Sequence, residues 1–224
     1  MPHETTLDVT ESSAQIGASF WAKKLHSLTG VVPIGAFLLE HFWTNSYAVY
    51  GPKAFDEAVE KLRSMPYVLF LEVGMIGLPI LYHSIYGIMI AVAGRPNNLR
   101  YHYARNWMYV LKRVTGVILL LYIGLHVYET RIESSIKGVT VTFDYMVKEL
   151  SEPGMFLFYL TGILSAVFHF ANGLWSFLIG WGITTTEKSM KRSAYVCTAI
   201  GVGLGLVGIN ALLGFFGKAV VINF

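Results

Sequence analysis

The 224-residue chain is 54% hydrophobic and only 14% charged, and its mean hydropathy is positive. A composition this apolar excludes an ordinary water-soluble domain and favours a protein that crosses a membrane several times. The formal net charge of +3 is small, and the basic residues are spread over several segments rather than gathered on one helix face. This pattern argues against nucleic acid as a partner.

Five segments are long and apolar enough to cross a bilayer, which takes about 20 residues in a helix. In chain order they are 25–47, 66–93, 108–131, 154–183 and 193–217. We therefore predict an all-α membrane protein with residues 1–24 as an N-terminal tail, 25–217 as a five-helix domain and 218–224 as a short C-terminal tail. The first twenty residues are polar and acidic, so no cleavable signal peptide is expected.

The distribution of charge indicates the orientation. With the N-terminus inside, ten of the 17 Lys and Arg residues fall on the inner side, among them Lys23, Lys24, Lys112 and Arg113. Basic residues concentrate on the cytoplasmic side of membrane proteins. We therefore expect a multi-pass protein with a cytoplasmic N-terminus and an outer C-terminus.

Two histidines lie in the outer halves of the first and third predicted helices. His41 follows Lys24 by 17 residues and His126 follows Arg113 by 13. At about 1.5 Å per residue, both have passed the middle of the membrane. Ionisable residues inside membrane helices are costly and point to function.

Two further histidines lie in the inner halves of the second and fourth helices, which run the other way. His83 follows Pro66 by 17 residues and His169 follows Pro153 by 16. The spacing within the chain is 86 residues for this pair and 85 for the outer pair. Depth therefore pairs the first helix with the third and the second with the fourth.

Glycines accompany the four histidines in matched positions. Thr-Gly-Val, with Gly30 and Gly116, precedes the outer histidines, and each inner histidine begins a His-x-x-x-Gly step that ends at Gly87 or Gly173. A flat macrocycle between helices needs close backbone approach, which glycine permits. Small residues also mediate ordinary helix packing in membranes, and the glycines alone favour that simpler interpretation.

The paired histidines predict two buried haems. Imidazole is a common axial ligand of haem iron, and helix bundles often hold cofactors between facing helices. His41 and His126 would bind the outer haem, and His83 and His169 the inner one. Because Cys197 is the only cysteine, thioether attachment is excluded and the haems would be b-type. A zinc site fits less well, since zinc takes three or four close ligands.

Longer motifs surround these histidines. They are HSLTGVVPIG at 26–35, Glu40-His41, LYHSIYG at 81–87, RNWMYVLKRVTG at 105–116, HVYETR at 126–131 and FHFANGLWSF at 168–177. With these motifs, residues 20–217 resemble the cytochrome b558 membrane anchors of succinate dehydrogenase, the single-subunit, five-helix type with two haems.

The resemblance implies a fold in which helices I–IV surround two b haems. It also implies a bacterial cytoplasmic-membrane complex with a flavoprotein that carries FAD and oxidises succinate, and with an iron–sulfur protein, both on the cytoplasmic face. The chain would not oxidise succinate itself. It would carry electrons from the iron–sulfur protein through the inner and then the outer haem to menaquinone, at a quinone site of its own. A dimer of the whole complex is compatible with this picture.

Resemblance and depth together suggest partners for the propionates of the inner haem. These are His26 and Ser27 at the start of helix I, and Arg113 at the inner end of helix III. The alternative for Arg113 carries equal weight: it could be an ordinary positive-inside anchor that extends to the membrane surface.

Glu72 lies near the outer end of helix II, about a turn and a half from the boundary. Quinone reduction consumes protons, so this carboxylate could relay them to a quinone near His41 and the segment 56–66. The simpler alternative is that Glu72 is hydrated at the interface.

Three other functions stay open. The closest is the anchor of a fumarate reductase. Some fumarate-reducing relatives carry a carboxylate two residues before the fourth ligand, where this chain has Val167, which favours succinate oxidation. The others are another quinone-linked dihaem cytochrome and, from a different class, a transporter or membrane scaffold without redox function.

Overall fold

The computed structural model describes residues 6–221, and all regular elements in that range are helical. Five helices are long and apolar enough to span a membrane, as predicted: Ser19–Tyr50, Val68–Val92, Ala104–Lys137, Met155–Gly180 and Glu187–Gly214. We refer to them as helices I to V. Helices I and III run past the predicted boundaries at both ends, and helix V does so at its start, because helices continue into polar ends that a hydropathy pattern leaves out. Helices II and IV lie within the predicted segments, and helix V ends before its predicted end.

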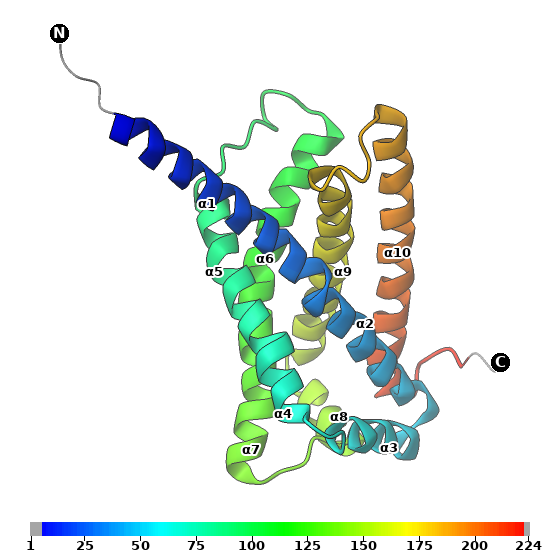
Figure 1. Ribbon diagram of the computed structural model, residues 1–224. Helices are drawn as coiled ribbons and strands as arrows, with labels where there is room; N and C mark the ends of the chain where they lie inside the picture. The colour runs from blue at the N-terminus through cyan, green and yellow to red at the C-terminus, as the bar shows by residue number, and fades with distance from the viewer. Residues whose placement is uncertain (1–5, 222–224) are drawn as a thin grey trace.

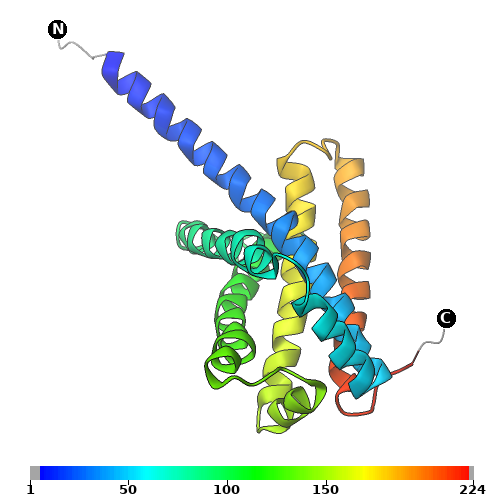
Figure 2. The same ribbon diagram turned by 60° about the horizontal axis from the view of Figure 1, so that its bottom comes forward.

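Helix I consists of α1 (Thr6–Val31), α2 (Pro33–Ser46) and a short 3-10 turn, η1 (Tyr47–Tyr50). Pro33 lacks an N–H donor, yet the Ala36 N–H still bonds to the Val32 carbonyl at 3.1 Å, so the helix continues past the proline. The segment predicted as an N-terminal tail is helical from Thr6. Figures 1 and 2 show this first part of α1 extending beyond the other helices; residues 1–5 and 222–224 lie outside the described range.

Helices II and III each change from α to π geometry towards one end. The remaining bounds are α4 Val68–Phe70, η2 Leu71–Gly77 (π) and α5 Leu78–Val92 in helix II; α6 Ala104–Val127, η3 Tyr128–Glu133 (π) and α7 Ser134–Lys137 in helix III; α9 Met155–Gly180 as helix IV; and α10 Glu187–Gly214 as helix V.

The first four helices form a closed bundle, and the fifth packs outside it. Helix α1 contacts α5, α5 contacts α6, α6 contacts α9, and α9 returns to α1, whereas α10 lies against α9 and α2 (Figure 1). The contact of α10 is close because it presents glycines. A Cβ on Gly208 would lie 3.0 Å from the Phe42 ring, and one on Gly214 would lie 2.7 Å from the Ala48 backbone.

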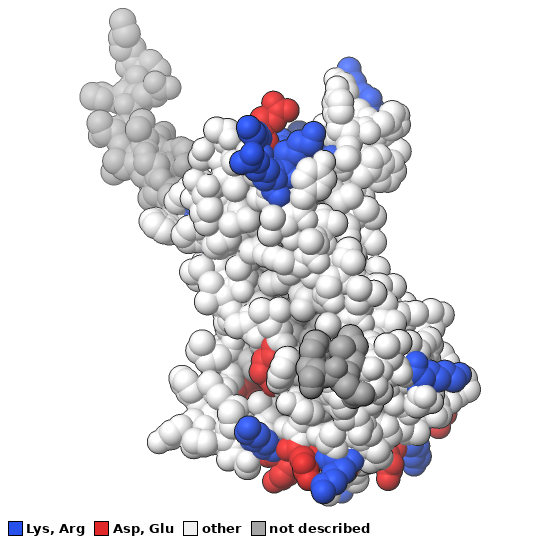
Figure 3. Space-filling model, turned by 90° about the vertical axis from the view of Figure 1, so that its right-hand side faces the viewer, with Lys and Arg blue, Asp and Glu red and all other residues white. Residues whose placement is uncertain are grey.

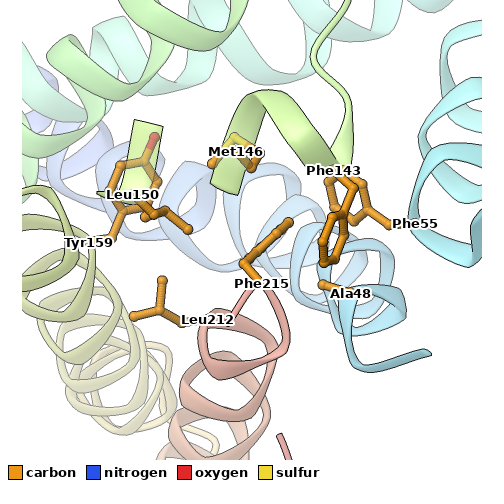
Figure 4. Close-up of a cluster of buried hydrophobic side chains, with 8 residues drawn as sticks. All are labelled: Ala48, Phe55, Phe143, Met146, Leu150, Tyr159, Leu212 and Phe215. Carbon is orange, nitrogen blue, oxygen red and sulfur yellow. The ribbon is translucent and has the colours of Figure 1, made fainter. Parts of the chain in front are cut away.

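Two amphipathic helices cover the end of the bundle that lies opposite the N-terminus. These are α3 (Pro52–Arg63) and α8 (Phe143–Ser151), and Figure 4 shows their apolar side chains meeting helices I, IV and V. The Asp56 carboxylate links the two, since its Oδ1 accepts from the Phe143 N–H at 2.7 Å. The buried cluster comprises Ala48, Phe55, Phe143, Met146, Leu150, Tyr159, Leu212 and Phe215.

Helix α8 also contacts helix III. The Tyr145 hydroxyl donates to the Glu129 carbonyl at 3.3 Å, and burial raises the pKa of Tyr145 further above its ordinary value. In the space-filling view, charged side chains lie at the two ends of the bundle, with Lys and Arg predominating over acidic side chains at the upper end and both signs mixed at the lower end. The surface between is largely uncharged (Figure 3). This banding is that of a membrane protein.

Candidate cofactor site

The structure brings the four intramembrane histidines together in the two pairs that depth predicted. The ring centres of His41 and His126 are 5.7 Å apart, and those of His83 and His169 are 6.2 Å apart. The rings of each pair stand nearly perpendicular, at 79° and 78°. Each pair joins diagonal helices of the bundle, I with III and II with IV.

Each inner histidine is oriented by a main-chain carbonyl. His83 Nδ1 lies 2.9 Å from the His26 oxygen, and His169 Nδ1 lies 3.0 Å from the Lys112 oxygen. A carbonyl can only accept, so both Nδ1 atoms carry the proton and both Nε2 atoms keep a free lone pair. Metal-binding histidines typically donate their other ring N–H to a carbonyl or carboxylate in this way.

The two inner sites repeat each other across the chain. Helix I presents the His26 carbonyl and, one turn later, Gly30 to the His83 ring, and helix III presents Lys112 and Gly116 to His169 in the same way. A Cβ on Gly30 would lie 2.5 Å from His83 Cε1, and one on Gly116 would lie 3.1 Å from His169 Cε1. The Thr-Gly-Val glycines therefore serve the inner histidines, although each precedes an outer one in the sequence.

The other two glycines behave differently. A Cβ on Gly87 would lie 3.3 Å from His26 Cε1, whereas one on Gly173 would meet nothing within 4 Å. Gly173 is thus not in close contact with any histidine. The space beside it would accept a larger group.

The His26 side chain lies within the inner layer. Its ring stacks on that of His83, with ring centres 4.0 Å apart and planes 20° apart. Its Nδ1 is buried and lacks a hydrogen-bond partner among the described residues. Ser27 is already engaged, because its hydroxyl donates to the Lys24 carbonyl at 2.9 Å and accepts from Trp181 Nε1 at 3.0 Å.

Two cations of helix III lie at the inner layer. Arg113 stacks over the Tyr109 ring at 3.4 Å and donates from Nη1 to the Tyr109 carbonyl, while its buried Nε has no partner in the part of the chain that the structure describes. Lys112 Nζ donates to Ser176 Oγ at 2.9 Å. Sequence reasoning singled out Arg113 among the basic residues here; the repeat with His26 could have added Lys112.

The outer pair has aromatic neighbours. His126 Nδ1 lies 3.3 Å from the Tyr159 hydroxyl, and the Tyr122 ring lies parallel to the His126 ring at 5.5 Å. On the other side, the Asn45 amide lies 3.4 Å from His41 Nε2 and donates to the His41 carbonyl. Neither tyrosine was singled out from the sequence, where no spacing distinguishes them from other aromatic residues.

The residues present fit a haem at each pair. Two metal–nitrogen bonds of about 2 Å, with ring centres roughly 1 Å behind each nitrogen, require a centre separation of about 6 Å, which both pairs match. The unpaired nitrogens of His26 and Arg113 at the inner layer suit the carboxylates of a macrocycle, because a buried donor without an acceptor is otherwise unfavourable.

Glu72 has no hydrogen bond to either histidine pair among the described residues and forms an ion pair with Arg131. Its Oε2 accepts from Arg131 Nη2 at 2.6 Å and from Arg131 Nε at 3.1 Å. Sequence reasoning placed Glu72 near the outer end of helix II and missed its partner. No local pattern could reveal it, because the two residues are 59 positions apart.

The fold and these pairs define the class: a helical membrane protein whose four-helix bundle holds two diagonal histidine pairs at different depths. Residues 94–208 match the model of the succinate dehydrogenase/fumarate reductase transmembrane subunit family. The chain is also 46% identical, over 196 residues that cover 88% of it and 96% of the relative, to the succinate dehydrogenase cytochrome b558 subunit of Bacillus subtilis (strain 168). It therefore belongs to the family of membrane-anchor cytochrome b subunits of succinate dehydrogenase and fumarate reductase.

Proposed function

We propose that the chain binds two b haems and conducts electrons from succinate to menaquinone. The observation that supports the proposal most strongly is that the Nδ1 atoms of both inner histidines are hydrogen-bonded to main-chain carbonyls. Both Nε2 atoms are thereby left free to bind a metal between the helices. His83 and His169 would hold the inner haem, and His41 and His126 the outer one. When bound, these groups supply one-electron transfer at two depths of the membrane.

The inner propionates would be held by polar groups at the start of helix I and the inner end of helix III. The unpaired Arg113 Nε and His26 Nδ1 support this role. Lys112 adds a nearby positive charge. Ser27 would take part by giving up its present bond to the Lys24 carbonyl.

The partners would be the flavoprotein and the iron–sulfur protein of a succinate dehydrogenase. They would dock at the basic end of the bundle, on the cytoplasmic side of a bacterial membrane. The test is made on the purified complex: a reduced-minus-oxidised spectrum should show b-type bands, and succinate should reduce menaquinone. Absence of the bands would refute the haem assignment. Oxidation of menaquinol by fumarate without reduction of menaquinone by succinate would favour a fumarate reductase.

The proposed orientation predicts opposite labelling at the two ends of the bundle. Asn97 and Ser64 are both exposed, at the basic and the opposite end respectively, and the native Cys197 is buried. We expect an impermeant maleimide added to intact cells to label Ser64→Cys and to leave Asn97→Cys unlabelled until the membrane is opened. The reverse pattern would place the N-terminus outside.

The quinone would bind near the outer haem, where Glu72 can pass protons from the outer water. Glu72→Gln keeps the shape of the side chain but cannot exchange a proton. We expect menaquinone reduction to fall by about tenfold or more, as for other lost general-acid groups, with both haem bands and succinate-dependent dye reduction unchanged. Normal quinone turnover in this variant would remove Glu72 from the site.

A further inference from the structure

Helices II and III both widen into π turns at the same end of the bundle. The two segments are η2 (Leu71–Gly77) and η3 (Tyr128–Glu133), each inside a membrane span. π turns are rare and are frequent at functional sites. Both lie beside the outer histidines, since η3 follows directly after the helix with His126 and η2 contacts α2, which carries His41.

The π turn of helix II determines the direction of Glu72. Eleven residues make slightly more than three whole turns of an α-helix, so in regular geometry Glu72 would lie above His83 on the inward face. Each additional residue in a turn rotates what lies beyond it by about 100°. The wide turn therefore moves Glu72 off the inward face, and the structure shows it meeting Arg131 of helix III.

Arg131 is held in place by hydrogen bonds, but not all of its N–H donors are used. Its Nε and Nη2 donate to Glu72 Oε2, and its Nη1 donates to Ser135 Oγ at 3.1 Å. A guanidinium has five N–H groups. Two of them, one on each terminal nitrogen, remain without an acceptor among the described residues. Glu72 Oε1 likewise receives no hydrogen bond from a donor in that part of the chain.

The pair is open to the membrane. The Arg131 side chain is 48% exposed and that of Glu72 is 33% exposed. Large apolar side chains next to them in the two π segments are also exposed, namely Val73, Tyr128 and Ile132. A molecule dissolved in the bilayer could therefore reach a charged, hydrogen-bonding group without passing through water.

We propose that Arg131 is a second residue of the quinone site, donating its free N–H groups to a carbonyl oxygen of the quinone head group. It also positions Glu72 through the ion pair. In the balanced reaction, the quinone takes two electrons supplied by succinate and two protons passed from the outer water by Glu72, and becomes the quinol. Arg131 neither gains nor loses a proton; its charge offsets the electrons as they arrive. This inference depends on the proposed outer quinone site.

The test compares Arg131→Met and Arg131→Lys in the whole complex with a matched control, Lys137→Met. Lys137 forms an ion pair with Glu133 at 2.5 Å on the same end of helix III. Three quantities are measured: the KM and kcat for menaquinone, the affinity of a non-reducible quinone analogue from its shift of the outer haem band, and succinate-dependent dye reduction.

We expect Arg131→Met to raise the KM for menaquinone and to weaken binding of the quinone analogue, each by about tenfold or more, as for loss of a charged hydrogen bond. Arg131→Lys keeps the positive charge but loses the two parallel N–H groups of the guanidinium. Its KM and its affinity for the analogue should therefore lie between those of Arg131→Met and the native protein. Dye reduction and both haem bands should stay unchanged in all three variants, and Lys137→Met should keep the native affinity.

Other results would overturn the inference in distinguishable ways. Native KM and analogue affinity in both Arg131 variants would remove Arg131 from the site and leave the outer site standing. Loss of the outer haem band would show that Arg131 serves the haem instead. An analogue that shifts only the inner haem band of the native complex would overturn the outer site itself. If Arg131→Met does not assemble, native affinity in Arg131→Lys is sufficient to refute the proposal.

Discussion

His83→Ala and His169→Ala are each expected to remove the same haem and to leave the other spectrally intact. The ring centres of the two histidines lie 6.2 Å apart, so both would hold the same haem, and removing either would take away half of the protein's attachment to it. The haem content of the purified chain should fall from two to one. The double variant should lose no more than either single variant, because both act on one site.

His41→Ala and His126→Ala should remove the other haem in the same way. Haem is quantified chemically, and the two components are separated by a redox titration that resolves their bands. The pairing would be contradicted if His41→Ala and His83→Ala depleted the same component. A transporter or scaffold with buried histidines would show no haem in any of these variants.

Gly30→Ala is expected to disturb the inner haem, whereas Gly173→Ala should not. The new methyl at position 30 would lie 2.5 Å from His83 Cε1 and 3.0 Å from His83 Nδ1, so the ring must move. Overpacking of this kind costs about 1–3 kcal/mol, enough to lower the affinity for the inner haem by about fivefold or more. The outer haem band should keep its native intensity.

Gly173→Ala is the matched control, because Gly173 follows His169 by four residues as Gly30 follows His26, but has nothing within 4 Å of the added methyl. Both variants are measured by haem titration of the purified protein. Equal losses of the inner haem would show that the effect arises from helix propensity or helix packing rather than from contact with His83. Unchanged binding in Gly30→Ala would mean that the ring can shift at no cost.

The sequence by itself determined the spans and the pairing of the histidines. Both depend on position along the helix axis, which increases by about 1.5 Å per residue whatever the neighbours do. An error of a few residues at a helix end therefore moves His41 or His169 by less than the separation of the two layers. The matched spacings of 85 and 86 residues within the two pairs were visible for the same reason.

Only the tertiary structure decided which way the side chains point and which residues they contact. Direction depends on rotation, and one extra residue in a turn changes it by about 100° while hardly changing the depth. The π turn in helix II is such a change, and it directs Glu72 to Arg131 rather than to the inward face. Contacts between distant residues depend on how the helices pack against each other, so the sequence could not reveal that Gly116 touches His169 while Gly173 touches no histidine.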